Sequence, residues 1–281
     1  MKQPQQILTE AIETWKPRQI VCLFSGGYDS MCATHLVHQL DTHGVPMSTW
    51  SINTLLSADG WFYYVLDVAD ELGFKNYHIF NNYKGFSQFR ESVRLTGCPR
   101  NRQGHTFTYQ KLKERAIDAI HMNYKRDIHD KTLFVSGMRR AESAYRANAE
   151  EHSRVGNSNK CFVAPIVHWS DLDVARYRIE NDLPDNPFYD TVKGSGDCQC
   201  NWGNFLTLGE LEMHSPYLAA NNVALINKLS MDNHGYGWDG TPRDQLGLFD
   251  DAQLDTPFLC TNCSRRDNKH KAAEFVIMQR I

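Results

Sequence analysis

Short apolar runs alternate with stretches of helical periodicity through the first two thirds of the chain. Apolar runs predict buried strands, and apolar side chains that recur every three or four positions predict helices. The predicted strands cover residues 20–24, 47–52, 77–80, 132–136 and 162–167, and the predicted helices cover residues 29–40, 60–72 and 109–122, with a further helix opened by Ser170. This alternation predicts an α/β fold, with a mostly parallel sheet and helices on both faces. Ligands of such folds bind where loops leave the carboxyl ends of the strands.

The amino-acid composition of the chain changes after Asp190. Residues 191–204 are rich in Gly, Asp and Cys, residues 232–251 are rich in Gly, Asp and aromatic side chains, and a helical stretch covers about residues 206–229 between them. We predict a main domain over residues 1–194 and a smaller, cysteine-containing C-terminal unit with little regular structure over residues 195–281. A chain of 281 residues is long enough for this arrangement.

Composition and charge narrow the class of protein. The chain is 41% hydrophobic and 22% charged, which is typical of a soluble globular protein. Its formal net charge of -3 argues against nonspecific coating of nucleic acid, although a local basic patch stays open. The polar residues 1–17 do not form a signal peptide, and there is no apolar run of the roughly 20 residues that a membrane helix needs. We therefore expect a cytoplasmic enzyme that does not associate with membranes.

The hexapeptide Ser25-Gly26-Gly27-Tyr28-Asp29-Ser30 lies between the first predicted strand and the first predicted helix. Two glycines permit a tight turn and a close approach of the backbone to an anion. The N–H groups and the dipole at the start of the helix would then hold phosphate, and Ser25 and Ser30 add hydroxyl donors. Asp29 is poorly suited to bind phosphate directly, but it could hold a Mg²⁺ ion that binds the phosphate. The alternative is an ordinary strand-to-helix turn that is capped by serine and aspartate. No Gly-Lys-Ser/Thr follows, so this is not a Walker A loop.

A second group of polar residues follows the strand predicted at residues 132–136. The segment Gly137-Met138-Arg139-Arg140-Ala141-Glu142-Ser143 comes directly after that strand, and Arg146 lies three residues further on. A guanidinium at a strand end can bind phosphate or sulfate through two parallel hydrogen bonds. We therefore predict that Arg139 binds the anion, with help from Arg140 and Arg146, which Glu142 would orient. The alternative is a solvated charged turn.

These segments resemble known families. The hexapeptide is similar to the Ser-Gly-Gly-x-Asp-Ser signature of PP-loop ATP pyrophosphatases. The segment from Gly137 to Arg146 resembles the Gly-x-Arg-x-x-Glu-Ser-x-x-Arg segment of the PAPS reductase family. Residues 165–174 and 183–190 resemble that family's Pro-Leu-x-x-Trp-x-x-x-Asp-Val and Leu-Pro-x-Asn-Pro-Leu-Tyr-Asp stretches. Asn53-Thr54 falls where relatives carry Asp-Thr, so Asn53 departs from the pattern. The agreement covers about residues 15–200 in the same order.

The resemblance implies a Rossmann-like fold of the adenine nucleotide alpha hydrolase type. It also implies an enzyme that binds ATP with Mg²⁺ and cleaves the nucleotide between its α and β phosphates. The residues that it assigns to the nucleotide are Ser25, Gly26, Gly27, Tyr28, Asp29, Ser30, Asn53, Thr54, Gly137, Arg139, Arg140 and Arg146. Asp29 and Arg139 are the expected catalytic residues among them.

Four cysteines form two close pairs, Cys198-Gln199-Cys200 and Cys260-Thr261-Asn262-Cys263. Four thiolates suit either Zn²⁺ or a [4Fe–4S] cluster, and the alternative is four free cytosolic thiols. Sulfur-handling relatives often carry the cluster, so the resemblance favours iron and sulfur. Many relatives carry Cys-x-x-Cys near Cys198, and the shorter spacing here is a departure.

Three functions are open. The first is a sulfonucleotide (PAPS or APS) reductase, but the last residues contain no Glu-Cys-Gly motif, and no adjacent cysteine pair precedes Lys111-Leu112-Lys113. The second is an ATP-cleaving enzyme that activates an acceptor for sulfur transfer, and we favour this one. The third is a nucleotide-binding partner subunit without catalysis. This function stays open because Asn53 replaces the aspartate that relatives carry at this position. The implied partners are an adenine nucleotide, a sulfur-donor protein and an acceptor, for which nucleic acid is one candidate.

Overall fold

The computed structural model describes residues 2–99, 102–200 and 206–238. Six strands form one sheet in the order β3-β2-β1-β4-β6-β5. All neighbouring pairs are parallel except β5–β6, which is antiparallel. The strands are β1 (Gln19–Leu23), β2 (Met47–Asn53), β3 (Tyr77–Asn81), β4 (Thr132–Val135), β5 (His152–Arg154) and β6 (Lys160–Val163). The predicted α/β class with a mostly parallel sheet is confirmed.

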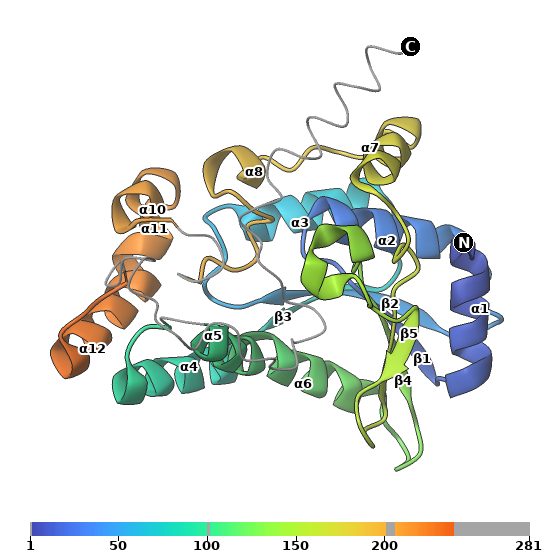
Figure 1. Cartoon of the computed structure of the whole chain (residues 1–281), viewed down its shortest axis with the longest axis horizontal. Helices are drawn as coiled ribbons and strands as arrows, with labels where there is room; N and C mark the ends of the chain where they lie inside the picture. Colours follow the sequence, from blue (N-terminus) through green and yellow to red (C-terminus); the bar gives the residue numbers. More distant parts are fainter. Residues whose placement is uncertain (1, 100–101, 201–205, 239–281) are drawn as a thin grey trace.

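Helices cover both faces of this sheet. Figure 1 shows α2, α3 and α7 on one side of the strands and α4, α5 and α6 on the other. The helices up to residue 191 are α1 (Pro4–Trp15), α2 (Tyr28–Gln39), α3 (Trp61–Glu71), α4 (Tyr83–Thr96), α5 (Arg102–Tyr109), α6 (Arg115–Tyr124), α7 (Asp171–Glu180) and α8 (Phe188–Thr191). Shorter turns are the π-helix η1 (Gln110–Glu114) and the 3₁₀ turns η2 (Arg140–Glu142) and η3 (Ala144–Arg146).

The core follows the alternation of side chains along the strands. Ile20 and Cys22 of β1 are fully buried within one large apolar cluster that also contains residues of α1, α2 and α3. Val21, between them, faces the opposite side and packs with Ile117 of α6 and Phe134 of β4. This period of two is what a strand that is buried on both faces requires.

Two predicted elements differ from the observed ones. The helix predicted over residues 109–122 is observed as η1 and α6, so it begins with a π-helical turn, and the additional helix α5 precedes it. The strand predicted over residues 162–167 ends at Val163. The chain then turns, because the amide of Val167 donates to the Ala164 carbonyl and that of Trp169 to the Ile166 carbonyl.

The described residues after 205 are helical and join the same core. They form α10 (Leu208–His214), α11 (Pro216–Leu218), the π-helix η4 (Ala219–Val223) and α12 (Ala224–His234). Leu211, Val223 and Ile226 are fully buried in the large cluster. The division at residue 194 stays a prediction. Within the described part of the chain, no helix combines the length and the apolar character that a bilayer crossing requires.

Candidate functional site

The turn between β1 and α2 has the shape that its glycines predict. Gly26 adopts a φ of +84°, in the left-handed region that glycine favours. The two serine hydroxyl oxygens lie 3.0 Å apart, and that of Ser30 donates to the Gly27 carbonyl at 2.8 Å. The indole N–H of Trp61 donates to the Ser25 carbonyl at 2.9 Å and holds the loop from α3. The loop is therefore fixed before any ligand binds, and the first N–H groups of α2 have no acceptor within the helix.

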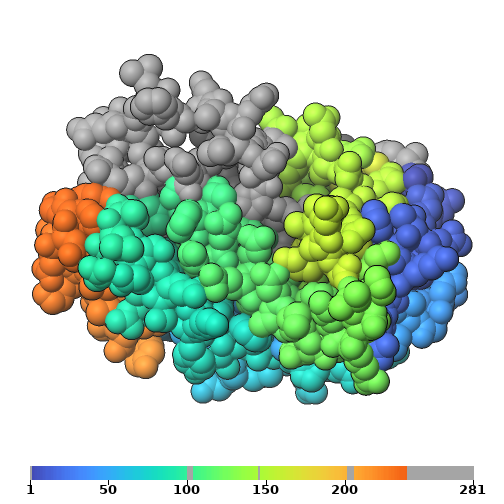
Figure 2. Space-filling model, turned by 90° about the horizontal axis from the view of Figure 1, so that it is seen from below, coloured from blue at the N-terminus to red at the C-terminus, as the bar shows by residue number. Residues whose placement is uncertain are grey.

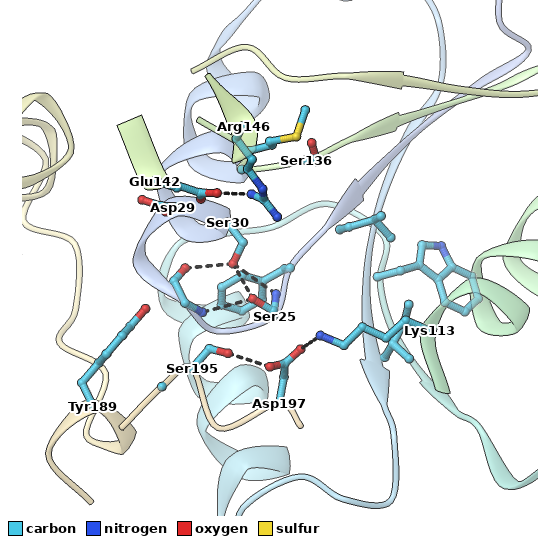
Figure 3. Close-up of a pocket in the computed structure, with 18 residues that line it drawn as sticks. Ser25, Asp29, Ser30, Lys113, Ser136, Glu142, Arg146, Tyr189, Ser195 and Asp197 are labelled. Atoms are coloured by element: carbon cyan, nitrogen blue, oxygen red, sulfur yellow. Dashed lines mark hydrogen bonds and ion pairs between the residues drawn. The ribbon is translucent and has the colours of Figure 1, made fainter. Parts of the chain in front are cut away.

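This loop forms one wall of a cavity at the carboxyl edge of the sheet (Figure 3). The cavity is lined by Leu23, Phe24, Ser25, Gly27, Asp29, Ser30, Trp50, Ile52, Lys113, Ser136, Gly137, Met138, Glu142, Arg146, Tyr189, Gly194, Ser195 and Asp197. Polar side chains from the loop, η1, η2, η3 and the 194–197 segment share the cavity with apolar residues from the ends of β1 and β2. A ligand with an apolar ring at one end and anionic groups at the other suits this lining.

Arg139 lies beneath the loop and does not line the cavity. Its side chain is 1% exposed, and its guanidinium contacts both carboxylate oxygens of Asp29, with the shorter distance, from Nε, at 2.9 Å. It also donates to Asp171, the first residue of α7, at 2.9 Å. Burial alone would lower the pKa of Arg139, but the Asp29 charge and hydrogen bond outweigh it, so the pKa is raised. This geometry does not match the predicted phosphate fork. We assign Arg139 as a positioning residue for Asp29, which does line the cavity.

The other predicted arginines have different surroundings. Arg146 lines the cavity and pairs with Glu142, which lines it too. Arg140 does not line it, because its guanidinium turns away and donates to the Ala149 carbonyl at 2.9 Å. Of the two, the structure therefore favours only Arg146 as a ligand contact, with Glu142 orienting it as the sequence predicted.

Gly137 has a steric role that its sequence context did not reveal. A Cβ atom at this position would lie 2.5 Å from the carbonyl carbon of Asp29 and 2.6 Å from the amide nitrogen of Ser30. The chain after β4 thus packs directly against the first turn of α2. Only a residue without a side chain lets these two backbones approach so closely.

Asn53 and Thr54 shape the loop that follows β2 rather than the cavity, and neither lines it. The Asn53 oxygen accepts from the Leu55 amide at 2.9 Å, and Leu55 has a φ of +61°. The Thr54 hydroxyl donates to the Asp197 carbonyl at 3.0 Å. The replacement of aspartate by Asn53 therefore does not alter the lining of the cavity.

A lysine that the sequence did not single out faces the loop across the cavity. Lys113, in η1, pairs with Asp197 at 2.6 Å, and Asp197 accepts from the Ser195 hydroxyl, also at 2.6 Å (Figure 3). The π-helical turn aims Lys113 into the cavity, and such turns often occur at functional sites. The sequence could not reveal these contacts, because they depend on the Ser195-Gly196-Asp197 segment lying close to Lys113 in space, and the spacing along the chain does not show that.

The segment around Tyr189 closes the cavity from the α8 side. The rings of Tyr189 and Tyr28 stack with centroids 4.5 Å apart, and the Tyr189 hydroxyl accepts from the Tyr28 amide at 3.4 Å. Asn186 donates to the carbonyls of Gly26 and Ser195 at 2.8 and 3.1 Å. Tyr28 is buried under this segment, which raises its pKa to about 12. Its ring therefore supports the loop, and Tyr28 itself does not line the cavity.

Ser136 directly follows β4 and lines the cavity. The side chain is 2% exposed, and its oxygen has no hydrogen-bond partner among the described residues. Because a buried hydroxyl without a partner costs free energy, a ligand that bonded with it would recover that cost. Ser136 is therefore a candidate contact that the sequence did not reveal.

The described cysteine pair lies next to the cavity, directly after Asp197. Cys198 is half-buried and Cys200 is buried. A hydrogen bond from Cys200 lowers the pKa of Cys198 to about 7, against the effect of burial and with help from the Lys113 charge. Among the described residues, no group of three or more His, Cys, Asp or Glu side chains is placed to hold a metal ion. Cys260 and Cys263 lie outside the described residues, so the predicted four-cysteine centre stays a prediction.

Comparison with known proteins supports the resemblance seen in the motifs. Over 66 residues the chain is 35% identical to an adenosine 5'-phosphosulfate reductase of Lysinibacillus sphaericus (strain C3-41), and over 71 residues it is 32% identical to that of Salinibacter ruber (strain DSM 13855 / M31). Each match spans 28% of the relative's length, and 24% and 25% of this chain respectively.

Solved structures with a similar fold include a phosphoadenylyl-sulfate reductase from Candida auris, at 17% identity and a TM-score of 0.48 over 67% of this chain and 84% of that one. An NMN synthetase from Francisella tularensis is 14% identical, with a TM-score of 0.49 over 86% of this chain and 98% of that one. The family model of the phosphoadenosine phosphosulfate reductase domain matches residues 19–216, which is more than half of the chain. The chain therefore belongs to the phosphoadenosine phosphosulfate reductase domain family.

Proposed function

We propose that this protein binds ATP with Mg²⁺, cleaves it between the α and β phosphates, and so activates an acceptor for sulfur transfer. The observation that carries the proposal is the charge arrangement of the cavity. The loop at residues 25–30, here called the phosphate loop, lies opposite two cations, Lys113 and Arg146. Lys113 is already paired with Asp197, and Arg146 is already paired with Glu142.

This arrangement favours a nucleotide that arrives with its own cation. A bare anion would meet three carboxylates, of Asp29, Glu142 and Asp197, and lining cations whose charges are already compensated. Carboxylate oxygens are the ligands that Mg²⁺ prefers, and Mg²⁺ is usually held by one or two of them together with phosphate oxygens. The donors therefore fit a metal that is bound jointly with the polyphosphate. When bound, Mg²⁺ would neutralise charge on the phosphates.

The chain's own residues would position the nucleotide. N–H groups at the start of α2 would hold phosphate oxygens, while Lys113 and Arg146 would stabilise charge that develops on the leaving pyrophosphate. The apolar ends of β1 and β2, with Trp50 and Ile52, offer a surface for the adenine ring. The segment around Tyr189 limits access of water from one side. A sulfur-donor protein and the acceptor would approach from the open side of the cavity.

A second candidate, sulfonucleotide reduction, is favoured by the names of the two curated relatives. A reductase would bind a sulfonucleotide in the same cavity and would need a thiolate to attack its sulfur. Cys198, with its lowered pKa, is the described thiol nearest to the cavity in sequence, one residue after Asp197.

We expect the purified protein to release pyrophosphate from ATP in the presence of Mg²⁺ once a suitable acceptor is added, and to bind ATP·Mg²⁺ more tightly than GTP·Mg²⁺. Lys113→Gln should weaken ATP binding by roughly one to two decades, because losing a contact between a charged group and a phosphate costs about 1.5–3 kcal/mol. Titration calorimetry and a coupled pyrophosphate assay measure the two quantities. Lys75→Gln, at an exposed position outside the cavity, is the matched control.

Each other outcome identifies a different function. Release of orthophosphate from ATP would contradict α–β cleavage. Release of sulfite from APS or PAPS with a thiol reductant would establish the reductase instead. ATP binding with no turnover against a broad set of acceptors would leave a nucleotide-binding partner subunit.

We also propose that Cys198, Cys200, Cys260 and Cys263 hold one metal centre. The described thiols supply half of a four-sulfur site, and the lowered pKa of Cys198 favours the thiolate that metals bind. Four thiolates fit a [4Fe–4S] cluster or Zn²⁺ equally well by number.

We expect anaerobically purified protein to contain about four irons with broad visible absorbance, or about one zinc without colour. Cys198→Ser should lower that content, whereas Cys161→Ser, in the buried strand β6, should not. Metal analysis with a count of alkylatable thiols tests this. A folded, metal-free protein in which all four thiols react would contradict both versions.

A further inference from the structure

Exposed aromatic and basic side chains occur on the neighbouring elements α4, α5, η1 and α6. Tyr83, at the start of α4, is 68% exposed, and Phe107, in α5, is 52% exposed. The Lys111 ammonium lies over the Phe107 ring, 4.9 Å from its centroid. The Asn82 side chain ties the start of α4 to η1 by donating to the carbonyls of Lys111 and Leu112 at 3.0 and 2.8 Å. Tyr83 is therefore held next to η1, and Figure 2 views the molecule from the side of these helices.

A hollow lined by residues of α4, η1 and α6, among them the Lys111 that lies over the Phe107 ring, has more cations than carboxylates. It is lined by Phe80, Asn82, Lys84, Gly85, Gln110, Lys111, Glu114, Arg115, Asp118 and Ala119. One of its two carboxylates, Asp118, is already paired with Lys160 from β6. Lys84 and Arg115 are exposed, and neither forms an ion pair within the described residues. The local balance is positive although the whole chain carries a formal charge of -3.

This surface adjoins the nucleotide cavity through a single turn of helix. Lys111 lines the hollow and Lys113 lines the cavity, and both belong to η1. At the sheet, Phe80 of β3 lines the hollow and pairs in register with Ile52 of β2, which lines the cavity. A molecule bound over the hollow would therefore lie next to the carboxyl edge where the nucleotide cavity opens.

We propose that the surface formed by Tyr83, Lys84, Phe107, Lys111 and Arg115, here called the aromatic–basic surface, binds single-stranded nucleic acid. Exposed rings offer stacking platforms for unpaired bases, and neighbouring cations offer contacts for the phosphates between them. The pairing of Lys111 with the Phe107 ring places both kinds of contact in one spot. In a duplex the bases are already stacked on each other, so these rings discriminate in favour of a single strand.

A protein partner fits this surface less well. Stable protein interfaces have an apolar, charge-depleted core, whereas here three cations, Lys84, Lys111 and Arg115, line the hollow, and one of them, Lys111, lies over the Phe107 ring. Where the proposed function holds, the bound strand would be the acceptor that ATP cleavage activates. This acceptor role depends on the proposed function, whereas binding of a strand to the surface does not.

The test measures binding without ATP. Fluorescence anisotropy with labelled oligothymidylate and oligouridylate of ~15 nucleotides, and with a duplex of the same length, compares the three targets on the full chain. We expect both single strands to bind more tightly than the duplex, with an affinity that falls between about 50 and 200 mM salt. The ratio between the RNA and DNA strands then identifies which of the two the surface prefers.

Two pairs of substitutions separate stacking from charge. Tyr83→Ala with Phe107→Ala should weaken binding by about tenfold or more at any salt concentration, through lost stacking. Lys84→Ala with Arg115→Ala should lower the slope of log affinity against log salt by about 1.4, at about 0.7 for each phosphate contact. Tyr217→Ala with Lys228→Ala, whose side chains are exposed on α11 and α12, is the matched control and should change neither quantity.

Three results of the binding measurements would overturn the proposal. They are the absence of binding to either single strand at the low salt concentration, equal affinity for duplex and single strand, and equal loss in the control variant. A concentration-dependent dimer that the aromatic pair of substitutions disrupts would show that a second copy of the chain covers the surface instead. No step of this binding test uses ATP. If the protein bound the strand but released no pyrophosphate, the proposed function would be contradicted and the proposal of strand binding would not.

Discussion

Arg139→Ala should destabilise the folded protein by about 3–5 kcal/mol, the usual cost of removing one partner of a buried ion pair. Arg139 is 1% exposed and contacts Asp29 and Asp171, and Asp29 is itself 6% exposed. Its removal would leave the Asp29 carboxylate buried beneath the phosphate loop without its cation. Urea unfolding measured by fluorescence would report the change. Because the loop sits on this pair, ATP binding should weaken as well.

Two comparisons make the interpretation specific. Arg140→Ala, one residue further on, removes a half-buried guanidinium that contacts a carbonyl and should cost less than half as much. Asp29→Asn combined with Arg139→Met should recover part of the loss, because neither residue would then leave a buried charge. If Arg139→Ala lowered ATP affinity with no change in the free energy of unfolding, Arg139 would be a ligand contact after all, as the sequence suggested.

Gly137→Ala should reduce nucleotide binding or turnover by about a hundredfold, the effect expected when a site is misplaced by about 1 Å. The new Cβ would meet the backbone of Asp29 and Ser30 at 2.5–2.6 Å, and none of those atoms can swing away as a side chain could. The first turn of α2 would have to move relative to β4. Titration calorimetry with ATP·Mg²⁺ and the pyrophosphate assay both report this displacement.

Gly209→Ala is the control for the same chemical change. Nothing lies within 4 Å of a Cβ at Gly209, which is in the first turn of α10, so affinity should be unchanged and stability equal or slightly higher. A Gly137→Ala protein with normal ATP affinity and a normal melting temperature would mean that α2 and β4 pack more loosely than the structure indicates.

Much of the fold was predictable because the buried strands consist of short runs of apolar residues. β1, β2, β3 and β4 lie within two residues of their predicted bounds. No predicted element covers α1 or α4, although in α1 the apolar residues Ile7, Leu8, Ala11 and Ile12 show the helical spacing. The edge strand β5 carries the polar residues His152, Ser153 and Arg154, so no apolar run could have indicated it.

The site was predictable where one segment carries it and unpredictable where several segments meet. The glycine–serine loop needs only local backbone geometry, and its motif specified it. The role of Arg139 depended on which side chain lies opposite, and that side chain is Asp29, 110 residues away. Lys113 and Asp197 meet across 84 residues of chain. No spacing rule encodes such pairs, because the parallel sheet brings them together only after folding.

The way the cavity is assembled has a consequence for synthesis of the protein. The loop at residues 25–30 is translated early, yet Tyr189 contacts the Tyr28 amide across 161 residues of chain. Even the central pair β1–β4 joins Gln19 to Thr132. At roughly 5–20 residues per second, many seconds pass before the last wall of the cavity exists. Until residues 132–135 have been synthesised, β1 has no parallel neighbour on its β4 side, and we expect chaperones to bind it there. The proposed nucleotide could bind only at the end of this process. It would therefore stabilise the folded domain and would not act as a template for folding.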